Sequence, residues 1–373
     1  MGGTHTGNEN LGVPTVPVTP RRILVTGGAG FIGRHLGHRL TAAGHTVTAL
    51  DLLNPQMHRE PERSVAGFPG EVVRGDVRDA AAVGAAVRAA DAVVHLAAET
   101  GVGQSMYETE RYETVNVAGT GVVLDAAARV DAPVVVLSSR AVYGQGAWEC
   151  PAHGRCTGTR CCADAVPSDS RESDLLAPVS VYGETKVGAE RLAGGAAARG
   201  LPVVVLRPQN VIGAGQALHN PYTGVLAAFA ARLAAGRPPL VYGDGSQTRD
   251  FIAVDDVAAV VAALLDDPAA WASHPVLNVG SGVRTTLREL AETACRAAGR
   301  TPDLEFVPVT RPGDVDDACA DLTRYRAAGL PEAAVSFPDA VAAFLAGARD
   351  EEPVDPGIWD RALDELSTPG SAT

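Results

Sequence analysis

Residues 22–33 read RILVTGGAGFIG, and this stretch decides how the chain begins to fold. The apolar run at 22–26 predicts a short buried strand, and the pattern at 31–43 predicts a helix. The glycines between them fit the spacing G-x-G-x-x-G, and they allow a tight turn that brings backbone amides close to a pyrophosphate at the helix N-terminus. The stretch therefore predicts a dinucleotide-binding turn made by Gly27, Gly30, Phe31, Ile32 and Gly33.

Two acidic residues extend this cofactor prediction. Asp51 ends the next expected strand, 45–51, about twenty residues beyond the glycines, where an acid binds the adenosine ribose. Its carboxylate would repel a 2′-phosphate, so the sequence favours NAD over NADP. Asp76 follows the third expected strand and could contact the adenine, or it could cap the following helix.

Strands and helices alternate along most of the chain. Strands are expected at 22–26, 45–51, 71–75, 91–96, 133–138, 202–207 and 275–279, and helices at 31–43, 80–90, 113–129, 184–199 and 254–265. This order predicts an α/β fold, a Rossmann-type doubly wound parallel sheet with a smaller C-terminal substrate-binding cap. The expected parts are a disordered tail (1–20), the cofactor domain (21–207 plus 246–282), the cap (208–245 plus 283–345) and a flexible tail (350–373).

Composition limits the class of protein. The chain has 373 residues, 46% hydrophobic and 20% charged, which allows a large core and excludes global disorder. A formal net charge of −13 argues against a nucleic-acid partner, which would need a basic surface. We expect a cytoplasmic protein without a membrane partner, because no apolar run could span a bilayer and no secretory signal precedes the first strand.

Three residues suggest catalytic chemistry. Tyr182 and Lys186 have the i, i+4 spacing that places them on one helix face. An ammonium beside a phenol favours the phenolate and so provides a base near neutral pH. Ser139 follows the strand at 133–138, and open α/β sheets carry functional groups at the carboxyl ends of their strands. Alternatively, Tyr182 and Lys186 could be surface helix residues, and Ser139 could cap a turn.

A series of short motifs covers residues 21–345. They are VTGGAGFIG, GDVRD, HLAAET, NVAGT, SSRAVYG, SVYGETK, RPQNVIG, RDFIAVDDV, NVGSG and RPGDV. In this order the chain resembles the extended short-chain dehydrogenases/reductases, and among them the NAD-dependent nucleotide-sugar epimerase/dehydratase family. The resemblance implies NAD as cofactor, a nucleotide-diphosphate sugar as substrate, and a homodimer formed through the helices at 113–129 and 184–199.

The resemblance also implies roles for individual residues. Tyr182 would be the base, Lys186 would hold the nicotinamide ribose and tune Tyr182, and Ser139 would hydrogen-bond the sugar oxygen. The remaining expected cofactor contacts are Val77, Ala97 and Ala98, beside Asp51 and Asp76. The expected substrate contacts are Asn210 near the diphosphate and the guanidinium groups of Arg249 and Arg311, which could instead form ion pairs with Asp250 or Asp314.

The family chemistry is oxidation of a sugar hydroxyl to a 4-keto sugar with formation of NADH, and an epimerase returns the hydride to the other face. Related dehydratases carry an Asp-Glu pair directly after the catalytic hydroxyl residue, where this chain has Arg140 and Ala141. We therefore expect a 4-epimerase. A dehydrogenase or decarboxylase of the same fold, and a non-catalytic nucleotide sensor, are the alternatives.

The motif SSRAVYG, the run at 99–108 and a cysteine-bearing insertion resemble a subgroup of sugar 4-epimerases. Some of these act on dTDP-6-deoxyhexoses such as dTDP-L-rhamnose, which favours that substrate class. Glu99, Thr100 and Gln104 follow the fourth expected strand and are candidate sugar contacts, although they could simply cap the loop.

The insertion spans residues 144–174 and holds four of the six cysteines. Thiolates and imidazole can complete a tetrahedral zinc site, so Cys150, His153, Cys161 and Cys162 are candidate ligands of a structural metal. The usual C-x-x-C spacing is absent, and free thiols or a disulfide are the alternatives. Because the insertion follows a catalytic strand, it could also cover the sugar pocket as a lid.

Overall fold

The computed structural model describes residues 19–218, 224–308, 314–349 and 357. The two predicted tails, 1–20 and 350–373, lie outside the described residues apart from residues 19, 20 and 357. Among the described residues, no helix is both long and apolar enough to cross a membrane.

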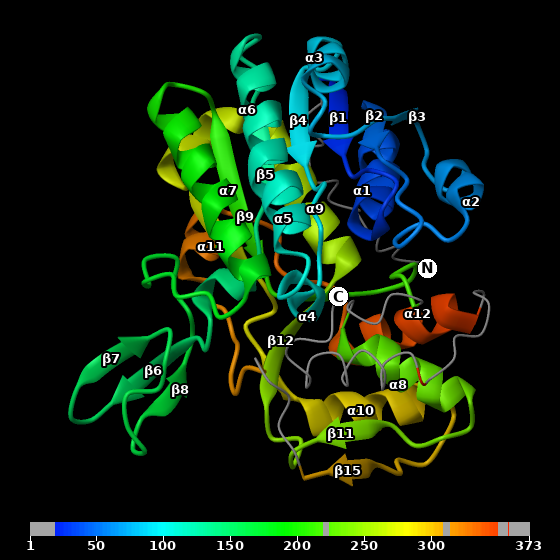
Figure 1. The fold of residues 1–373 in the computed structure, drawn as a ribbon, viewed down its shortest axis with the longest axis vertical. Coiled ribbons are helices and arrows are strands. Elements are labelled where there is room, and N and C mark those ends of the chain that lie inside the picture. The colour runs from blue at the N-terminus through cyan, green and yellow to red at the C-terminus, as the bar shows by residue number, and fades with distance from the viewer. Residues whose placement is uncertain (1–18, 219–223, 309–313, 350–356, 358–373) are drawn as a thin grey trace, which may run out of the picture.

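A seven-stranded parallel sheet forms the centre of the molecule (Figure 1). Its order is β13-β9-β5-β4-β1-β2-β3, so the chain starts in the middle, at β1, and winds outward in both directions. The strands are β1 (Arg22–Thr26), β2 (Thr46–Asp51), β3 (Glu71–Arg74), β4 (Ala92–His95), β5 (Val134–Leu137), β9 (Val203–Pro208) and β13 (Val276–Val279). The predicted doubly wound α/β fold is confirmed.

Helices cover both faces of this sheet, because successive strand residues point to opposite sides. In β1, Ile23 and Val25 join one core cluster, whereas Leu24 joins the other. The first cluster includes residues of α1 (Phe31–Ala42) and α9 (Val254–Asp266), and the second includes residues of α3 (Ala80–Arg88), α6 (Thr120–Ala128) and α7 (Val181–Ala198).

A separate core forms the cap, at the bottom of Figure 1. It packs α8 (Val225–Ala234), α10 (Leu287–Ala297) and α12 (Phe337–Arg349) against short strands. These strands are β10 (Asn210–Ile212), β12 (Thr248–Ala253) and β14 (Arg284–Thr286) in one sheet, and β11 (Leu240–Tyr242) and β15 (Glu305–Val307) in another. Helix α11 (Thr323–Ala327) was placed in the cap by the sequence division, but its Tyr325 belongs to the core of the large sheet. The division itself stays a prediction.

The predicted insertion, 144–174, forms a small antiparallel sheet of its own that projects from the body at the lower left of Figure 1. Its strands are β6 (Ala147–Cys150), β7 (Gly154–Thr157) and β8 (Val166–Ser168), with β6 in the middle. Several shorter elements complete the described chain: α2 (Pro61–Ala66), α4 (Val102–Ser105), α5 (Thr109–Tyr112), η1 (Glu113–Gly119), η2 (Arg140–Tyr143) and η3 (Pro268–Ser273).

The helix expected at 113–129 is not a uniform α-helix. Its first part, η1, has π-helical hydrogen bonding, which is rare and often occurs at functional sites. Asn116 in this segment accepts a hydrogen bond from the backbone N–H of Glu99 and donates one to Thr185 of α7. The segment therefore ties the loop after β4 to the helix that carries Tyr182.

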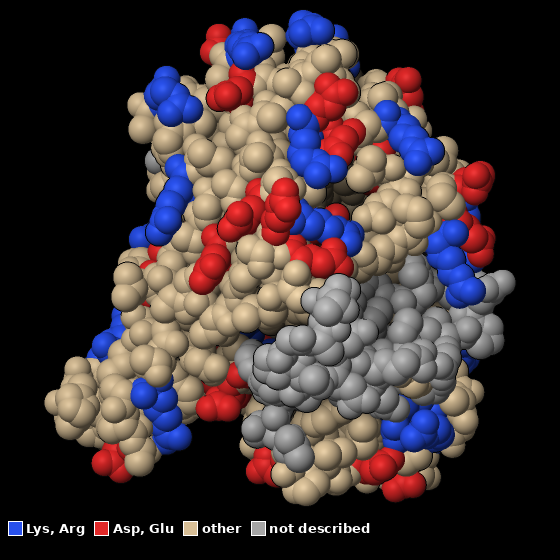
Figure 2. Space-filling view, viewed as in Figure 1, with Lys and Arg blue, Asp and Glu red and all other residues tan. Residues whose placement is uncertain are grey.

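On the visible surface, positively and negatively charged side chains are interspersed (Figure 2). Figure 2 shows Lys and Arg beside Asp and Glu on the upper part of the face it presents. Among its described residues, the face in Figure 2 therefore presents no single-sign basic surface, and the absence of a nucleic-acid partner stays a prediction.

Candidate active site

A large cavity lies between the carboxyl ends of the central strands and the cap. Its volume is about 1910 Å³. Pockets that hold one small ligand usually measure roughly 300–1000 Å³, so this cavity has room for two ligands side by side. One end is lined by the glycine turn, including Gly27 and Gly30, and the other by cap residues, including Phe229 and Tyr242.

The glycine turn has the geometry of a pyrophosphate site. Gly27 has a φ of +69°, and a Cβ on this residue would lie 2.7 Å from the amide nitrogen of Ala97. A Cβ on Gly33 would lie only 2.4 Å from the carbonyl oxygen of Gly28, so the first turn of α1 packs directly on the loop. Gly30 is the N-cap of α1, and no side chain occupies the amides of that helix end. Those amides are free to bind an anion.

Asp51 lies at the end of β2 and is buried. Its carboxylate accepts hydrogen bonds from the backbone N–H groups of Ala29 (3.1 Å) and Leu53 (2.9 Å), which hold it against the glycine turn. This is the expected place for the acid that binds a ribose, and Asp51 also lines the cavity. Its role in binding stays a prediction.

The other expected cofactor contacts also line the cavity: Phe31, Ile32, Asp76, Val77, Ala97 and Ala98. The alternative interpretation of Asp76 as a helix cap is wrong, because Asp79 caps α3 by accepting from the N–H groups of Ala81 and Ala82. Asp76 instead pairs with Arg78 at 2.6 Å, and its hydrogen bond with that guanidinium lowers the pKa of the Asp76 carboxyl.

Tyr182 and Lys186 lie in the first two turns of α7. The helix begins at Val181, because the Ser180 hydroxyl accepts a hydrogen bond from the N–H of Gly183 at 3.1 Å. The Lys186 ammonium donates to the carbonyl oxygen of Leu137 at 2.9 Å and lies 5.9 Å from the centre of the Tyr182 ring. Both side chains and Ser139 line the cavity, so the fold brings the three expected catalytic residues together.

The protonation of these groups follows from their surroundings. Burial raises the pKa of Tyr182, whereas a hydrogen bond with Ser139 and the positive charge of Arg140 act to lower it. Burial lowers the pKa of Lys186 to about 8, against the attraction of Glu190. The tuning of Tyr182 by Lys186 stays a prediction, and Ser139 and Arg140 are two further groups that act on the Tyr182 pKa. Ser139 also caps η2, because its hydroxyl accepts from the N–H of Ala141 at 3.1 Å.

The expected sugar contacts after β4 line the same cavity, and each also has a partner within the protein. Glu99 pairs with Arg111 at 2.8 Å, and the carbonyl oxygen of Thr100 accepts a hydrogen bond from Tyr112 at 2.6 Å. Gln104 is buried and hydrogen-bonded to two neighbouring side chains. These bonds hold the loop in place, and contact with substrate stays a prediction for all three residues.

The expected diphosphate end of the site includes two amide side chains, Gln209 and Asn210, which both line the cavity. Their side-chain oxygens are buried and accept no hydrogen bond from the described residues. Arg249 also lines it, but its guanidinium is buried in an ion pair with Asp314 and donates to the carbonyl oxygen of Thr248. Arg311, the second expected arginine, lies outside the described residues.

The cysteine-bearing insertion does not cover this cavity. Among the described residues, those lining the cavity include none from 144–174. The prediction of a lid is therefore wrong for this structure, because the small sheet projects away from the cap (Figure 1). The four expected metal ligands do come together within the insertion.

Comparison with known proteins agrees with this geometry. A family model described as the NAD dependent epimerase/dehydratase family matches residues 23–280. The chain belongs to this family. It is 38% identical over 332 residues to dTDP-L-rhamnose 4-epimerase of Burkholderia thailandensis, covering 82% of this chain and 89% of that protein. UDP-glucose 4-epimerase of Mycolicibacterium smegmatis is 36% identical over 311 residues, covering 82% of this chain and 91% of that protein.

Solved structures of the family have the same fold. UDP-glucose 4-epimerase of Thermus thermophilus in complex with NAD matches with a TM-score of 0.72 and 30% identity, covering 89% of this chain and all of that one (100%). MoeE5 in complex with UDP-glucuronic acid and NAD matches with a TM-score of 0.70 and 30% identity, covering 88% of this chain and 99% of that one. As a member of the NAD dependent epimerase/dehydratase family, the protein has NAD as its cofactor.

Arg140 is a site residue that the sequence reasoning missed. It begins η2 directly after Ser139 and lines the cavity. Burial lowers the pKa of its guanidinium to about 10, which still leaves it charged at neutral pH. The charges of Arg249 and Asp314 act on its guanidinium, which lies at the wall of the cavity. Its position directly after Ser139, at the end of a central strand, was the signal available in the sequence.

Replacing Arg140 with Met is expected to move the pH profile of turnover upward. The base must be deprotonated to act, so kcat rises as pH increases through the pKa of Tyr182. The Arg140 charge lowers that pKa, and removing the charge therefore shifts the rising limb to higher pH. Arg140→Lys keeps the charge and should leave the limb near its original position. An unshifted limb in Arg140→Met would contradict this role.

Proposed function

We propose that this protein is an NAD-dependent nucleotide-sugar 4-epimerase that acts on a dTDP-6-deoxyhexose such as dTDP-L-rhamnose. The observation that carries the proposal is the placement of Tyr182, Ser139 and Lys186 in one cavity with the glycine turn. The similarity to dTDP-L-rhamnose 4-epimerase over most of both chains supports the choice of reaction and substrate.

The proposed mechanism transfers one proton and one hydride away from the sugar and then returns both. NAD, when bound at the glycine turn, would supply the acceptor for the hydride from C4 of the sugar and the donor for its return. The Tyr182 phenolate removes the proton from the C4 hydroxyl, while Ser139 donates a hydrogen bond to the same oxygen. Arg140 is close enough to Tyr182 to lower its pKa, and its positive charge stabilises negative charge on the sugar oxygen during transfer. Tyr182 then returns the proton after the sugar has presented its other face.

The rest of the cavity supports recognition of the nucleotide part. The open N-terminus of α1 would hold the cofactor pyrophosphate, and Asp51 its adenosine ribose. The side-chain oxygens of Gln209 and Asn210, which accept no hydrogen bond within the described part of the chain, would accept hydrogen bonds from the sugar nucleotide. Arg311 is proposed to bind the diphosphate on the strength of the RPGDV motif alone.

The test is to incubate the purified protein with a panel of dTDP- and UDP-sugars and to follow the sugar protons by NMR. Inversion at C4 without net NAD reduction, fastest for a dTDP-6-deoxyhexose, is the expected result. Carbon dioxide release or net NADH formation would instead indicate a decarboxylase or dehydrogenase, and the chain is also 30% identical to a UDP-N-acetyl-alpha-D-glucosaminuronate decarboxylase. NAD binding without turnover of any sugar would support the nucleotide sensor.

The homodimer also stays a prediction. Helices α6 and α7 pack side by side on one face of the sheet and are the expected interface. Leu192 of α7 is an exposed apolar side chain on that surface, with 38% of its area accessible. Light scattering of the purified protein should give twice the mass of one chain, and Leu192→Glu should lower it.

A further inference from the structure

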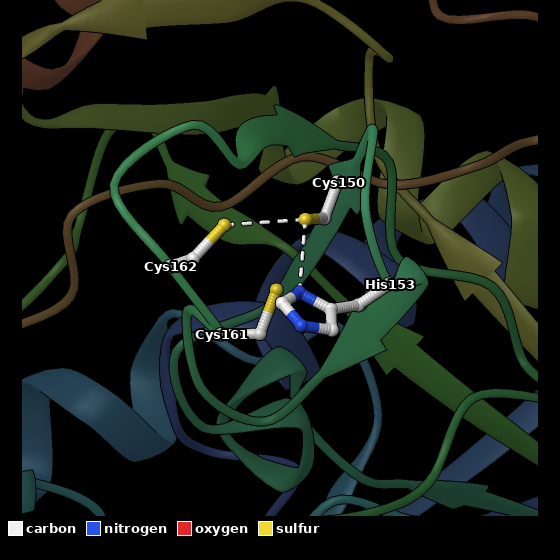
Figure 3. Close-up of side chains that lie close together, drawn as sticks. All are labelled: Cys150, His153, Cys161 and Cys162. Carbon is white, nitrogen blue, oxygen red and sulfur yellow. Dashed lines mark hydrogen bonds between the residues drawn. The ribbon is translucent and has the colours of Figure 1, made fainter.

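Four potential metal ligands converge at one end of the β6–β8 sheet. Cys150 ends β6, His153 lies in the turn that leads to β7, and Cys161 and Cys162 lie in the loop before β8. Figure 3 shows the three sulfur atoms and the imidazole ring directed toward one another. The ligand atoms of all four residues lie within 4.8 Å of one another.

The separations fit a tetrahedral metal ion. Cys150 Sγ lies 3.2 Å from both Cys162 Sγ and His153 Nδ1. Zinc bonds of about 2.3 Å to sulfur and about 2.0 Å to nitrogen place tetrahedral ligand atoms roughly 3.5–3.8 Å apart. The observed atoms are thus nearly in place, and the ion would need only small side-chain movements.

We propose that Cys150, His153, Cys161 and Cys162 bind a zinc ion that stabilises the insertion. Three thiolates and one imidazole form a complete structural set that leaves no open position for substrate. Zinc knuckles commonly take two ligands from one C-x-x-C segment. Here the ligands come from a strand end, a turn and a separate loop, so that spacing is absent. The site is independent of the proposed epimerase activity.

The insertion has only a small core of its own. Its strands contain three or four residues each, and small isolated sheets of this kind are barely stable in water. Its core cluster consists of Trp148, Cys150 and Ala165, with Cys156 and Cys162 packed against it. Two of the four proposed ligands, Cys150 and Cys162, therefore belong to this small core. A bound ion would supply the stability that so small a core lacks.

Ion pairs also hold the insertion together and join it to the cap. Arg155 of β7 pairs with Asp174 at 2.6 Å and with Glu149, its cross-strand partner on β6, at 2.9 Å. Arg284 of the cap strand β14 pairs with Asp169 at 2.5 Å. The proposed metal would add a link between the β6–β7 turn and the loop before β8.

The chemistry of the ligand set fits a structural metal. Thiolate is the form of cysteine that binds zinc, and a bound ion stabilises that form. The cavity described above includes none of the four ligands among its described lining residues, so the ion is structural rather than catalytic.

The first measurement is the metal content of the full-length protein, purified without an affinity tag that binds metal and dialysed against metal-free buffer. Elemental analysis should find about one zinc per chain. Cys161→Ser should reduce this content at least severalfold. Cys156→Ser is the matched control, because Cys156 lies on neighbouring β7 but outside the ligand set, and it should retain the zinc.

A second measurement separates loss of metal from failure to fold. Treatment of the wild-type protein with a strong chelator should make the 147–168 segment susceptible to limited proteolysis, while the cofactor domain still binds NAD. Added zinc should restore protection in the wild type but not in Cys161→Ser. This result does not depend on turnover, so it stands even if the proposed epimerase activity fails.

Three results would overturn the proposal. Wild-type protein with no zinc, which also gains none when titrated with zinc under reducing conditions, would exclude the site. A mass 2 Da below that of the reduced chain, with thiols that do not react with a thiol reagent, would identify a disulfide instead. Zinc retained in Cys161→Ser but lost in Cys156→Ser would show that the ligand set is wrong.

Discussion

Replacing Tyr182 with Phe is expected to lower kcat for C4 epimerisation by roughly 10²–10⁴-fold, the usual contribution of a general acid–base group. The variant lacks the hydroxyl that exchanges the proton, but it keeps the ring that packs at the start of α7. The glycine turn and Asp51 are unchanged, so bound NAD should remain near the wild-type content. Sugar turnover is measured by NMR, and NAD by extraction and chromatography.

Tyr143→Phe provides the matched control. Tyr143 is buried and hydrogen-bonded to Asn278 and Arg207, and it does not line the cavity. Its replacement removes the same atom and is expected to lower stability by about 1–3 kcal/mol while leaving kcat of the folded protein close to wild type. Turnover by Tyr182→Phe at the wild-type rate would reject Tyr182 as the base.

Replacing Gly33 with Ala is expected to weaken NAD binding strongly. The added Cβ would lie 2.4 Å from the carbonyl oxygen of Gly28 and 2.6 Å from its Cα, so the first turn of α1 must move away from the loop. Overpacking of this kind costs about 1–3 kcal/mol. If this strain is present mainly in the NAD-bound conformation, the affinity for NAD falls roughly ten- to hundredfold. Isothermal titration calorimetry of the cofactor-free protein with NAD measures the change in affinity.

Gly194→Ala makes the same chemical change where there is space. Gly194 lies inside α7, and nothing lies within 4 Å of the position its Cβ would take. Alanine in a helix interior is favoured over glycine by about 1 kcal/mol, so this variant should be more stable and bind NAD as the wild type does. If Gly33→Ala binds NAD with unchanged affinity, the close contact between α1 and the loop does not position the cofactor.

Local sequence patterns were sufficient to predict the cofactor half of the molecule. The strand before Gly27 and the helix after Gly30 show their own periodicity, and Asp51 ends the next strand. Each feature depends on residues that are near one another in the chain. The spacing of Tyr182 and Lys186 is also local, because a single helix places them on one face. The family membership followed from these motifs in order, and the comparisons confirmed it.

Other features depend on which segments meet in space, and the sequence alone did not reveal them. The charge of Arg140 acts on Tyr182 because η2 and the start of α7 line one cavity, although the two residues are far apart in the chain. The short strands β10, β12 and β14 form a sheet only by pairing across long separations, so no periodic signal marked them.

The insertion illustrates the same division. The sequence of the insertion contains four candidate ligands, but their irregular spacing does not predict whether the side chains converge. Antiparallel pairing of β6 with both β7 and β8 brings the turn and the loop to the same end of the sheet, and this places the ligand atoms within 4.8 Å. The sequence by itself determined the residue types and the local elements. The tertiary structure decided which charges and ligands face one another, because such contacts depend on the packing of distant segments.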